Sequence, residues 1–446
     1  MNKIQNIFLF TLLLSTIICF GPSKVLPYTA PFICMALFFF SNFINKDIFY
    51  KTIFLLFLII LFFLYYYLIY PGFLIKNYFL AIITYGSFIP LFIINRRHLN
   101  NHKLYLKVIN FISIITIIEG LIGISQYCYN YIKSGWSFSI GDSVEGTIHL
   151  HPAAAGGFNN PIFVVNMIFF ICFLASFKKY MIYSSQNIRL INFAIIIGAI
   201  SIIIATVIHA IIFLLFSMLF ILIINNKRKI IAVITRRKRN VIIIFSFIAI
   251  LFFGKSYYMP SLHMVKYYYY LAVSNKTNFP KSVITIKAIS QIPKDNPLMI
   301  VAGLGPGQFS SRASLILSGV YIGGKDYQQR KQLDNKTSPM MKKYLLPIIV
   351  NSKSSLRGST SKPYYSLLSL FTEMGLLGIV GLVFVVIRVI NKIRIKNIFI
   401  QNRIKYLFTV QISFLLLLAM QENYLEFTQA IFPGLLLMKL QYSALQ

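Results

Sequence analysis

The chain has 446 residues, of which 57% are hydrophobic and only 12% are charged. A water-soluble protein of this length cannot bury so much apolar surface, so the lipid bilayer must solvate much of the chain. Lysine and arginine number 43 against 10 acidic residues. A basic nucleic-acid-binding protein is not built from hydrophobic helices, so nucleic acid is excluded as a partner. Membrane topology explains the excess of basic residues better.

The hydropathy pattern predicts an all-α polytopic membrane protein with about twelve transmembrane helices, since about 20 apolar residues span a bilayer. The first segment lacks a small-residue cleavage site and is predicted to be retained as a helix. The seventh and eighth segments form a tight pair with His209 at their turn. The predicted helices lie near residues 4–20, 25–43, 52–69, 78–95, 105–128, 158–177, 189–207, 209–225, 240–254, 366–390, 404–420 and 424–440.

The distribution of lysine and arginine predicts the orientation of these helices. Every second connection is rich in basic residues, whereas the short connections on the opposite side hold only Lys24, Lys76 and Lys133. By the positive-inside rule the basic side is cytoplasmic, and both termini fall there. The chain then divides into helices one to nine (1–254), a large extracytoplasmic loop (255–365) and helices ten to twelve (366–446).

The large loop is strongly basic, with sixteen lysines and arginines against Asp295, Asp326 and Asp334. Long loops escape the positive-inside rule, so this charge favours an anionic partner such as a pyrophosphate, an acidic glycan or lipid headgroups. Simple adhesion to the lipid surface is the alternative. Aromatic and aliphatic runs within the loop predict that it folds against the membrane surface.

A glycine-rich turn in this loop contains Gly303, Gly305 and Gly307, and Arg312 follows it closely. Such a turn leaves backbone N–H groups free to approach an anion or a sugar, which makes the three glycines candidate substrate contacts. A turn without any ligand is the alternative interpretation.

Residues 361–378, where the loop re-enters the membrane, resemble the signature of the O-antigen ligase and O-antigen polymerase superfamily. That signature reads His-Asn, two residues, Leu, four residues, Glu, one residue, Gly, two residues, Gly. Leu368, Glu373, Gly375 and Gly378 fall on its register. The glycine turn resembles the family's Gly-x-Gly-x-Gly-x-Phe segment, and residues 120–126, 146–147 and 156–161 resemble two further motifs.

The match departs from the family at its histidine and arginine. The loop histidine falls on Tyr364, the following asparagine on Tyr365, and the arginine of the paired-helix turn on His209. Ligases of the family are thought to depend on the histidine and the arginine, whereas polymerases vary more here. The departures therefore favour a polymerase.

The resemblance implies a GT-C-like membrane glycosyltransferase of the bacterial inner membrane that needs no metal or other cofactor. Its donor would be a glycan on polyprenyl (undecaprenyl) pyrophosphate, and it would join repeat units into a surface polysaccharide such as O-antigen or capsule. A chain-length regulator and a flippase are implied partners, together with the lipid bilayer. The alternatives are a ligase that hands the glycan to lipid A-core or to protein, a twelve-helix transporter or lipid flippase, and an inactive scaffold.

Arg312, Tyr364, Glu373 and His209 are the candidate catalytic residues. Arginine suits a pyrophosphate and the charge that develops as it leaves. Histidine could transfer a proton or supply a cation, and tyrosine could stack on a sugar or donate to an oxygen. A carboxylate near the start of a membrane helix is expensive unless it is paired, so Glu373 either orients a basic loop residue or acts as a base.

Arg357 and Tyr365 are additional candidate substrate contacts. The competing interpretations are ordinary ones: solvated loop arginines, a capping histidine and tyrosines that anchor the membrane interface. His149 and His151, near Asp142 and Glu145, raise the question of zinc, but no full set of ligands is evident in the sequence.

Overall fold

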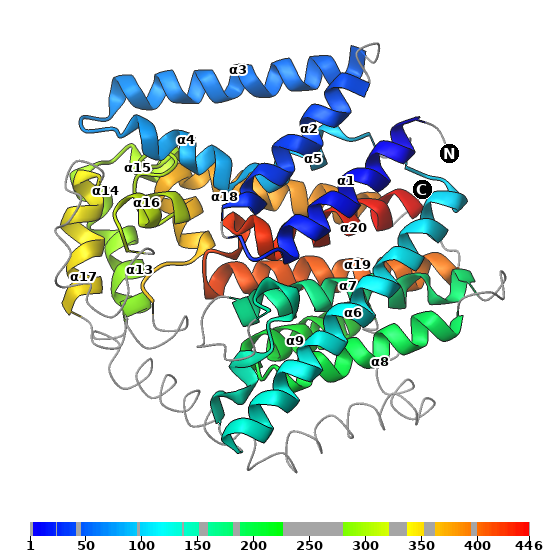
Figure 1. The fold of residues 1–446 in the computed structure, drawn as a ribbon. Coiled ribbons are helices and arrows are strands. Elements are labelled where there is room, and N and C mark those ends of the chain that lie inside the picture. The colour runs from blue at the N-terminus through cyan, green and yellow to red at the C-terminus, as the bar shows by residue number, and fades with distance from the viewer. Residues whose placement is uncertain are drawn as a thin grey trace.

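The computed structural model describes residues 3–23, 25–41, 46–95, 99–135, 138–150, 159–181, 188–225, 280–320, 337–351, 362–393 and 399–445. All regular secondary structure in these ranges is helical (Figure 1). A helix occupies each predicted segment that falls within them, because a long apolar segment satisfies its backbone polar groups only by forming one. The predicted helix at 240–254 lies outside the described residues.

The part of the chain before residue 226 contains long helices joined by short connections. Their bounds are α1 Lys3–Phe20, η1 Leu26–Thr29, α2 Ala30–Ser41, α3 Lys46–Ile69, α4 Ile75–Thr84, η2 Gly86–Phe88, α5 Ile89–Ile93, α6 His102–Ser134, η4 Phe138–Ser143, η5 Gly146–Ile148, α7 Asn159–Met181, α8 Ile188–Ile204 and α9 Ile208–Asn225.

The part after residue 279 begins with short helices and ends with three long ones. Their bounds are α13 Pro280–Ser290, α14 Ile292–Asp295, α15 Met299–Ala302, α16 Arg312–Leu317, η9 Met341–Leu345, α17 Leu346–Asn351, α18 Ser366–Ile393, α19 Phe399–Gln421, η12 Tyr424–Glu426 and α20 Thr428–Ala444.

Six of the described helices are long and apolar enough to cross a membrane, so the protein is an α-helical membrane protein. These spans are Lys3–Phe20, Phe49–Ile69, His102–Lys133, Asn159–Lys178, Ser366–Ile390 and Asn402–Gln421. The segment predicted at 78–95 forms two helices, α4 and α5, bent by 44° at the break between them, and would make a seventh span. Helices α8 and α9 are apolar but shorter, so twelve spans remain a prediction.

The last predicted helix starts later than its hydropathy suggests and lies at the centre of the molecule. Residues 424–426 form the separate turn η12, and α20 begins at Thr428. Helix α20 is almost entirely buried and packs against α1, α7 and α19 (Figure 1). By contrast, few residues of the apolar spans in α3 and α18 are buried, as is typical of helices that face lipid.

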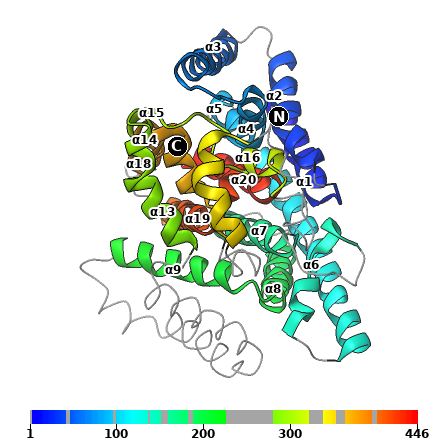
Figure 2. The same ribbon diagram turned by 90° about the vertical axis from the view of Figure 1, so that its left-hand side faces the viewer.

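The short helices of 280–320 and 337–351 build a second hydrophobic core against the ends of α3, α4 and α18. Tyr66 and Tyr70 of α3 donate their hydroxyls to the carbonyls of Ala302 and Gly303. These short helices lie at the end of the long helices opposite both termini (Figure 1). Figure 2 views the molecule from this side, with α13 and α16 in front of α19 and α20.

Candidate functional site

Helix α18 is broken at Gly375, and the glycine turn of residues 303–309 lies against the break. Gly375 has φ 65° and ψ −158°, which is not a helical conformation. A Cβ on Gly375 would lie 2.4 Å from the carbonyl oxygen of Val301, and a Cβ on Gly303 would lie 2.2 Å from the carbonyl carbon of Glu373. Glycine is required here because the two backbones touch.

The break in α18 frees carbonyl groups that the turn then satisfies. The N–H of Leu304 donates to the carbonyl of Thr372 at 2.8 Å, and the N–H of Gly305 donates to the carbonyl of Glu373 at 2.9 Å. Unpaired carbonyls inside a membrane protein are costly, so this pairing stabilises both the turn and the interrupted helix.

The side chain of Glu373 organises the same turn. Its carboxylate accepts the backbone N–H of Gly307 at 2.5 Å and those of Phe309 and Ser311 at 2.9 Å each. The residue is 1% exposed. The predicted pairing with a basic loop residue is thus replaced, in this geometry, by three charge-assisted bonds from backbone amides.

The N–H groups of the three turn glycines are engaged within the protein. Gly303 donates to the carbonyl of Met299 at 2.9 Å, Gly305 to Glu373, and Gly307 to the Glu373 carboxylate. All three have positive φ angles, between 77° and 100°. The glycines therefore shape the turn and position Arg312, rather than offering free N–H groups to a ligand.

Arg312 begins helix α16 directly after the turn. Its guanidinium carbon lies 3.8 Å from the centre of the Phe427 ring, and its Nε donates to the hydroxyl of Tyr28. Its backbone N–H donates to the Glu426 carboxylate. These contacts come from two distant segments, η1 and the residues at the end of η12, and hold the guanidinium over an aromatic ring, a favourable cation–π arrangement.

Two lysines approach the same region from other segments. Lys362 precedes α18, and its Nζ lies 3.6 Å from a carboxylate oxygen of Glu422. Lys281, in the first turn of α13, donates from Nζ to the carbonyl of Gln421. Together Lys281, Arg312, Lys362, Glu422 and Glu426 form what we call the charged cluster.

The turn between α19 and α20 carries both glutamates of the charged cluster and is held by hydrogen bonds to its surroundings. Ser366 donates its N–H to the carbonyl of Glu422 at 3.2 Å, and its hydroxyl accepts the N–H of Leu425 at 3.0 Å. The amide of Asn423 donates to the carbonyl of Ser310 at 2.8 Å. The start of α18, the glycine turn and the α19–α20 turn are thereby fixed relative to one another.

Burial shifts the protonation of the charged cluster towards its neutral forms. Burial raises the pKa of Glu426 to about 8 and lowers that of Lys281 to about 8. Burial also lowers the pKa of Lys362, and the nearby carboxylate of Glu422 partly offsets this decrease. Burial raises the pKa of Glu422, and the positive charges of Lys362 and Lys281 act in the opposite direction. A bound anion would favour the protonated, charged form of the two lysines, so the charged cluster should take up protons when an anion binds.

The buried carboxyl of Glu426 makes stability depend on pH. Its folded pKa of about 8 lies above the unfolded value of about 4.3. The folded protein therefore binds more protons between these values, and its stabilisation is lost as the pH rises through the folded pKa. We expect the thermal unfolding temperature in detergent to fall between about pH 5 and pH 8. Glu426→Gln should make this slope shallower, and an unchanged slope would contradict the assignment.

His209 lies at the α8–α9 turn and reaches the charged cluster through an aromatic neighbour. Its Nε2 is 3.1 Å from the hydroxyl of Tyr424. Thr206, three residues before it in the same turn, has a φ of 54°, which is unusual for a residue other than glycine. The structure therefore brings His209 next to the turn that carries Glu422 and Glu426.

Tyr364 and Tyr365 lie at the edge of the charged cluster. The Tyr364 ring is buried in the second hydrophobic core, with the Nζ of Lys362 at 5.9 Å from its centre. Tyr365 has its hydroxyl 2.9 Å from that of Thr285, and Lys281 lies 5.9 Å from its ring centre. Arg357, the remaining predicted contact, lies outside the described residues.

Lys281, Lys362, Glu422 and Glu426 were not among the residues predicted from the sequence. The sequence does contain a feature that could have identified the two glutamates as site residues. Two of only 10 acidic residues lie four positions apart between two apolar segments. All five glutamates of the chain are in fact buried, at Glu119, Glu145, Glu373, Glu422 and Glu426. No comparable signal marks the lysines, which belong to a loop with many basic residues.

The described residues contain no group of three or more His, Cys, Asp or Glu side chains placed to hold a metal ion. The cluster instead offers one arginine and two lysines beside buried carboxyls, an arrangement suited to binding an anionic group and moving protons. Comparisons with protein-family models, with curated proteins and with solved structures give no match for this chain.

Proposed function

We propose that this protein polymerises oligosaccharide repeat units carried on polyprenyl pyrophosphate into a surface polysaccharide. The observation that carries the proposal is the convergence of Lys281, Arg312 and Lys362, from three separate segments, around the α19–α20 turn. Such a group of cations in a partly buried setting suits a pyrophosphate. The resemblance of residues 303–309 and 361–378 to the O-antigen ligase and polymerase superfamily supports the same function.

In the proposed reaction the acceptor hydroxyl attacks the anomeric carbon of the donor glycan, and the bond from that carbon to the pyrophosphate breaks. The pyrophosphate leaves with the bonding electrons, and the three cations stabilise the charge that develops on it. Glu422 keeps Lys362 oriented in the absence of donor. Because the leaving group is already an activated phosphate ester, the proposed reaction needs no nucleotide sugar and no resident cofactor.

The arrangement of the helices supports the proposed location of the reaction at the outer face of a bacterial inner membrane. The charged cluster lies at the end of the helices where 280–320 and 337–351 pack, and both termini lie at the other end (Figure 1). If the basic connections and both termini are cytoplasmic, as the positive-inside rule predicts, the charged cluster lies on the extracytoplasmic side. We propose that lipid-linked repeat units are joined on that side.

The test is deletion of the gene in its native host, with the surface glycan then resolved by size on a gel. Wild type, Arg312→Ala and Lys294→Ala are returned to the deletion strain. Lys294 is an exposed lysine in the same part of the chain and is the control. We expect single repeat units on the normal anchor in the deletion strain, full rescue by wild type and Lys294→Ala, and a loss of rescue of about 100-fold or more with Arg312→Ala.

Other outcomes identify other functions. Full-length glycan stranded on the carrier lipid would indicate a ligase that acts on lipid A-core or protein. A glycan ladder that is unchanged by the deletion would overturn the proposal and favour a transporter, a lipid flippase or an inactive scaffold.

A further inference from the structure

Four of the five buried glutamates use their carboxylates to accept hydrogen bonds that hold the fold together. Glu373 and Glu426 accept the backbone N–H groups described above. Glu119 in α6 accepts the N–H of Thr147 at 2.9 Å and its hydroxyl at 2.5 Å. The fourth of these carboxylates belongs to Glu145.

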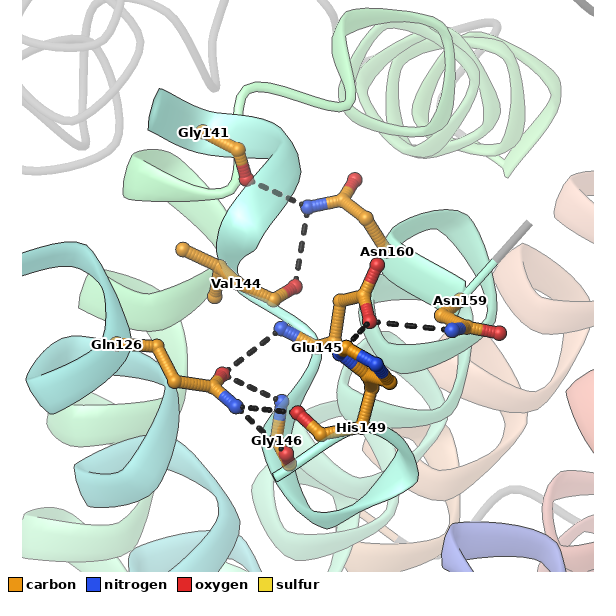
Figure 3. Close-up of polar contacts among 8 residues, drawn as sticks. All are labelled: Gln126, Gly141, Val144, Glu145, Gly146, His149, Asn159 and Asn160. Atoms are coloured by element: carbon orange, nitrogen blue, oxygen red, sulfur yellow. Dashed lines mark hydrogen bonds and ion pairs between the residues drawn. The ribbon is translucent and has the colours of Figure 1, made fainter. Parts of the chain in front are cut away.

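Glu145 lies in the connection between α6 and α7 and is a structural carboxylate of this kind (Figure 3). Its Oε2 accepts the side-chain amide of Asn159 at 3.1 Å and lies 3.3 Å from the Nδ1 of His149. Gln126 of α6 accepts the backbone N–H of Glu145 at 3.0 Å and donates to the carbonyl of His149 at 2.8 Å. The carboxylate belongs to a polar network that fixes a loop, and this role explains its burial.

Glu422 differs from the other four, because neither of its carboxylate oxygens accepts a hydrogen bond from the part of the chain that the structure describes. Its Oε1 lies 3.6 Å from the Nζ of Lys362, which is beyond hydrogen-bond distance. The residue is only 3% exposed. A buried carboxylate without hydrogen bonds is costly, so its presence needs a reason other than holding the fold together.

The carboxylate of Glu422 is carried by a firmly held turn among the cations of the charged cluster. The N–H of Glu422 donates to the carbonyl of Leu418 at 3.2 Å, and its carbonyl accepts the N–H and the hydroxyl of Ser366 at 3.2 Å and 3.3 Å. The charged and titratable groups around this turn are Lys281 of α13, Arg312 of α16, Lys362 before α18, His209 of α9, and Tyr424 and Glu426 of η12. The three cations favour the ionised form of Glu422 and oppose the effect of burial.

The cations of the charged cluster are more accessible than its carboxylates. Lys281, Arg312 and Lys362 are half-buried, whereas Glu422 and Glu426 are buried. An anion from outside therefore reaches the cations without first displacing a carboxylate. It then shares the cations with Glu422, and each of the two negative charges disfavours the other.

We propose that Glu422 is a built-in competing anion, which weakens the hold of the charged cluster on pyrophosphate and takes up a proton from solvent when pyrophosphate binds. The inference rests on the proposed glycosyl transfer. In that reaction the product, a polyprenyl pyrophosphate, has one ester bond fewer than the donor and therefore one more ionisable oxygen. When Glu422 returns its proton to solvent, its negative charge promotes the release of this more strongly charged product.

A purely structural ion pair predicts the opposite effect of neutralising Glu422. If the carboxylate only held Lys281 and Lys362 in place, its loss would weaken anion binding at every pH. A competing anion predicts tighter binding without the carboxylate, and only at a pH at which Glu422 is ionised. As the pH falls, Glu422 of the wild type becomes protonated, so the affinity of the wild type approaches that of Glu422→Gln.

The experiment measures the binding of isopentenyl pyrophosphate, a water-soluble pyrophosphate monoester like the proposed product, to the purified full-length protein by titration calorimetry in detergent. Wild type, Glu422→Gln and Glu145→Gln are compared. Glu145→Gln removes a buried carboxylate outside the charged cluster and is the matched control, which should bind as the wild type does. We expect Glu422→Gln to bind about 10-fold more tightly than wild type near pH 7, and the difference to disappear near pH 5.

Equal or weaker binding by folded Glu422→Gln near pH 7 would overturn the inference, and the proposed function would stand because the wild type still binds pyrophosphate. A wild type that does not bind the ligand would overturn both. A wild type that binds as expected but does not extend lipid-linked repeat units would overturn the polymerase alone and leave Glu422 as the competing anion of a pyrophosphate site.

Thermal unfolding shows whether Glu422→Gln is folded, and sulfate provides a second test that needs only the wild type. Sulfate does not titrate in this range of pH, so a change in its affinity reports on the protein. We expect sulfate to bind about 10-fold more tightly near pH 5 than near pH 7, because protonation removes the competing charge of Glu422. An affinity for sulfate that does not change with pH would overturn the inference.

Discussion

Gly375→Ala should prevent the protein from reaching its folded state. The residue combines a φ of 65° with backbone contacts in which a Cβ would lie 2.4 Å from the Val301 oxygen and 2.6 Å from the Gly303 nitrogen. This combination of φ 65° and ψ −158° is essentially restricted to glycine and costs about 1–3 kcal/mol for an L-residue. The overlap with backbone cannot be relieved by a side-chain rotation, so the glycine turn must leave α18. We expect a total loss of at least about 4 kcal/mol.

The measurement is the yield of monodisperse protein after extraction into detergent, followed by thermal unfolding. Gly381→Ala is the matched control, because it lies in the same helix and a Cβ there would meet no atom within 4 Å. That change should be neutral or slightly stabilising, since alanine favours a helix over glycine by up to about 1 kcal/mol. Equal behaviour of the two variants would show that the turn does not pack in the break of α18.

Glu373→Ala should have the second-largest effect, because it leaves three backbone donors without an acceptor in a buried site. Each unsatisfied buried donor costs about 1–3 kcal/mol, so we expect a loss of at least about 3 kcal/mol. Glu373→Gln should be milder. Its amide oxygen can still accept from Phe309 and Ser311, but its NH₂ group would face the N–H of Gly307.

Thermal unfolding in detergent tests this order, with Asp295→Asn as the control for removing a carboxylate. Asp295 pairs with Lys343 at the surface, and exposed ion pairs contribute little, so the control should unfold close to wild type. If Glu373→Gln were as stable as wild type while chain extension was lost, Glu373 would have a chemical role beyond holding the turn.

The positions of the long helices in the described part of the chain were predictable because hydropathy is a local property of each segment. The prediction was wrong at the start of the last helix. The polar residues there belong to the turn η12, and the polar residues further along belong to the buried surface of α20. Gln429 and Gln441 of α20 are buried and donate to Cys19 and Ser176. Apolar length alone does not distinguish such a central helix from one that faces lipid.

The candidate site was predictable only in part, because its residues come from segments that sequence alone does not bring together. Arg312, His209 and Tyr365 were predicted and do lie in or beside the charged cluster. The role of Glu373 was foreseen as a pairing role, but its partners are backbone N–H groups, which leave no mark in the sequence. Lys281 and Lys362 become recognisable only when the α19–α20 turn is placed beside them.

The burial of α20 also has a consequence for biosynthesis. Its partners α1 and α7 precede it in the chain and are made earlier, so the face that they offer to α20 must stay open or be covered temporarily until that helix is made. Asn166 of α7 is one residue of this face that lacks its partner until α20 is made, because its amide donates to the carbonyl of Gln429 in α20 at 2.9 Å. Assembly of the bundle therefore depends on a late step in which α20 packs between helices that were made before it.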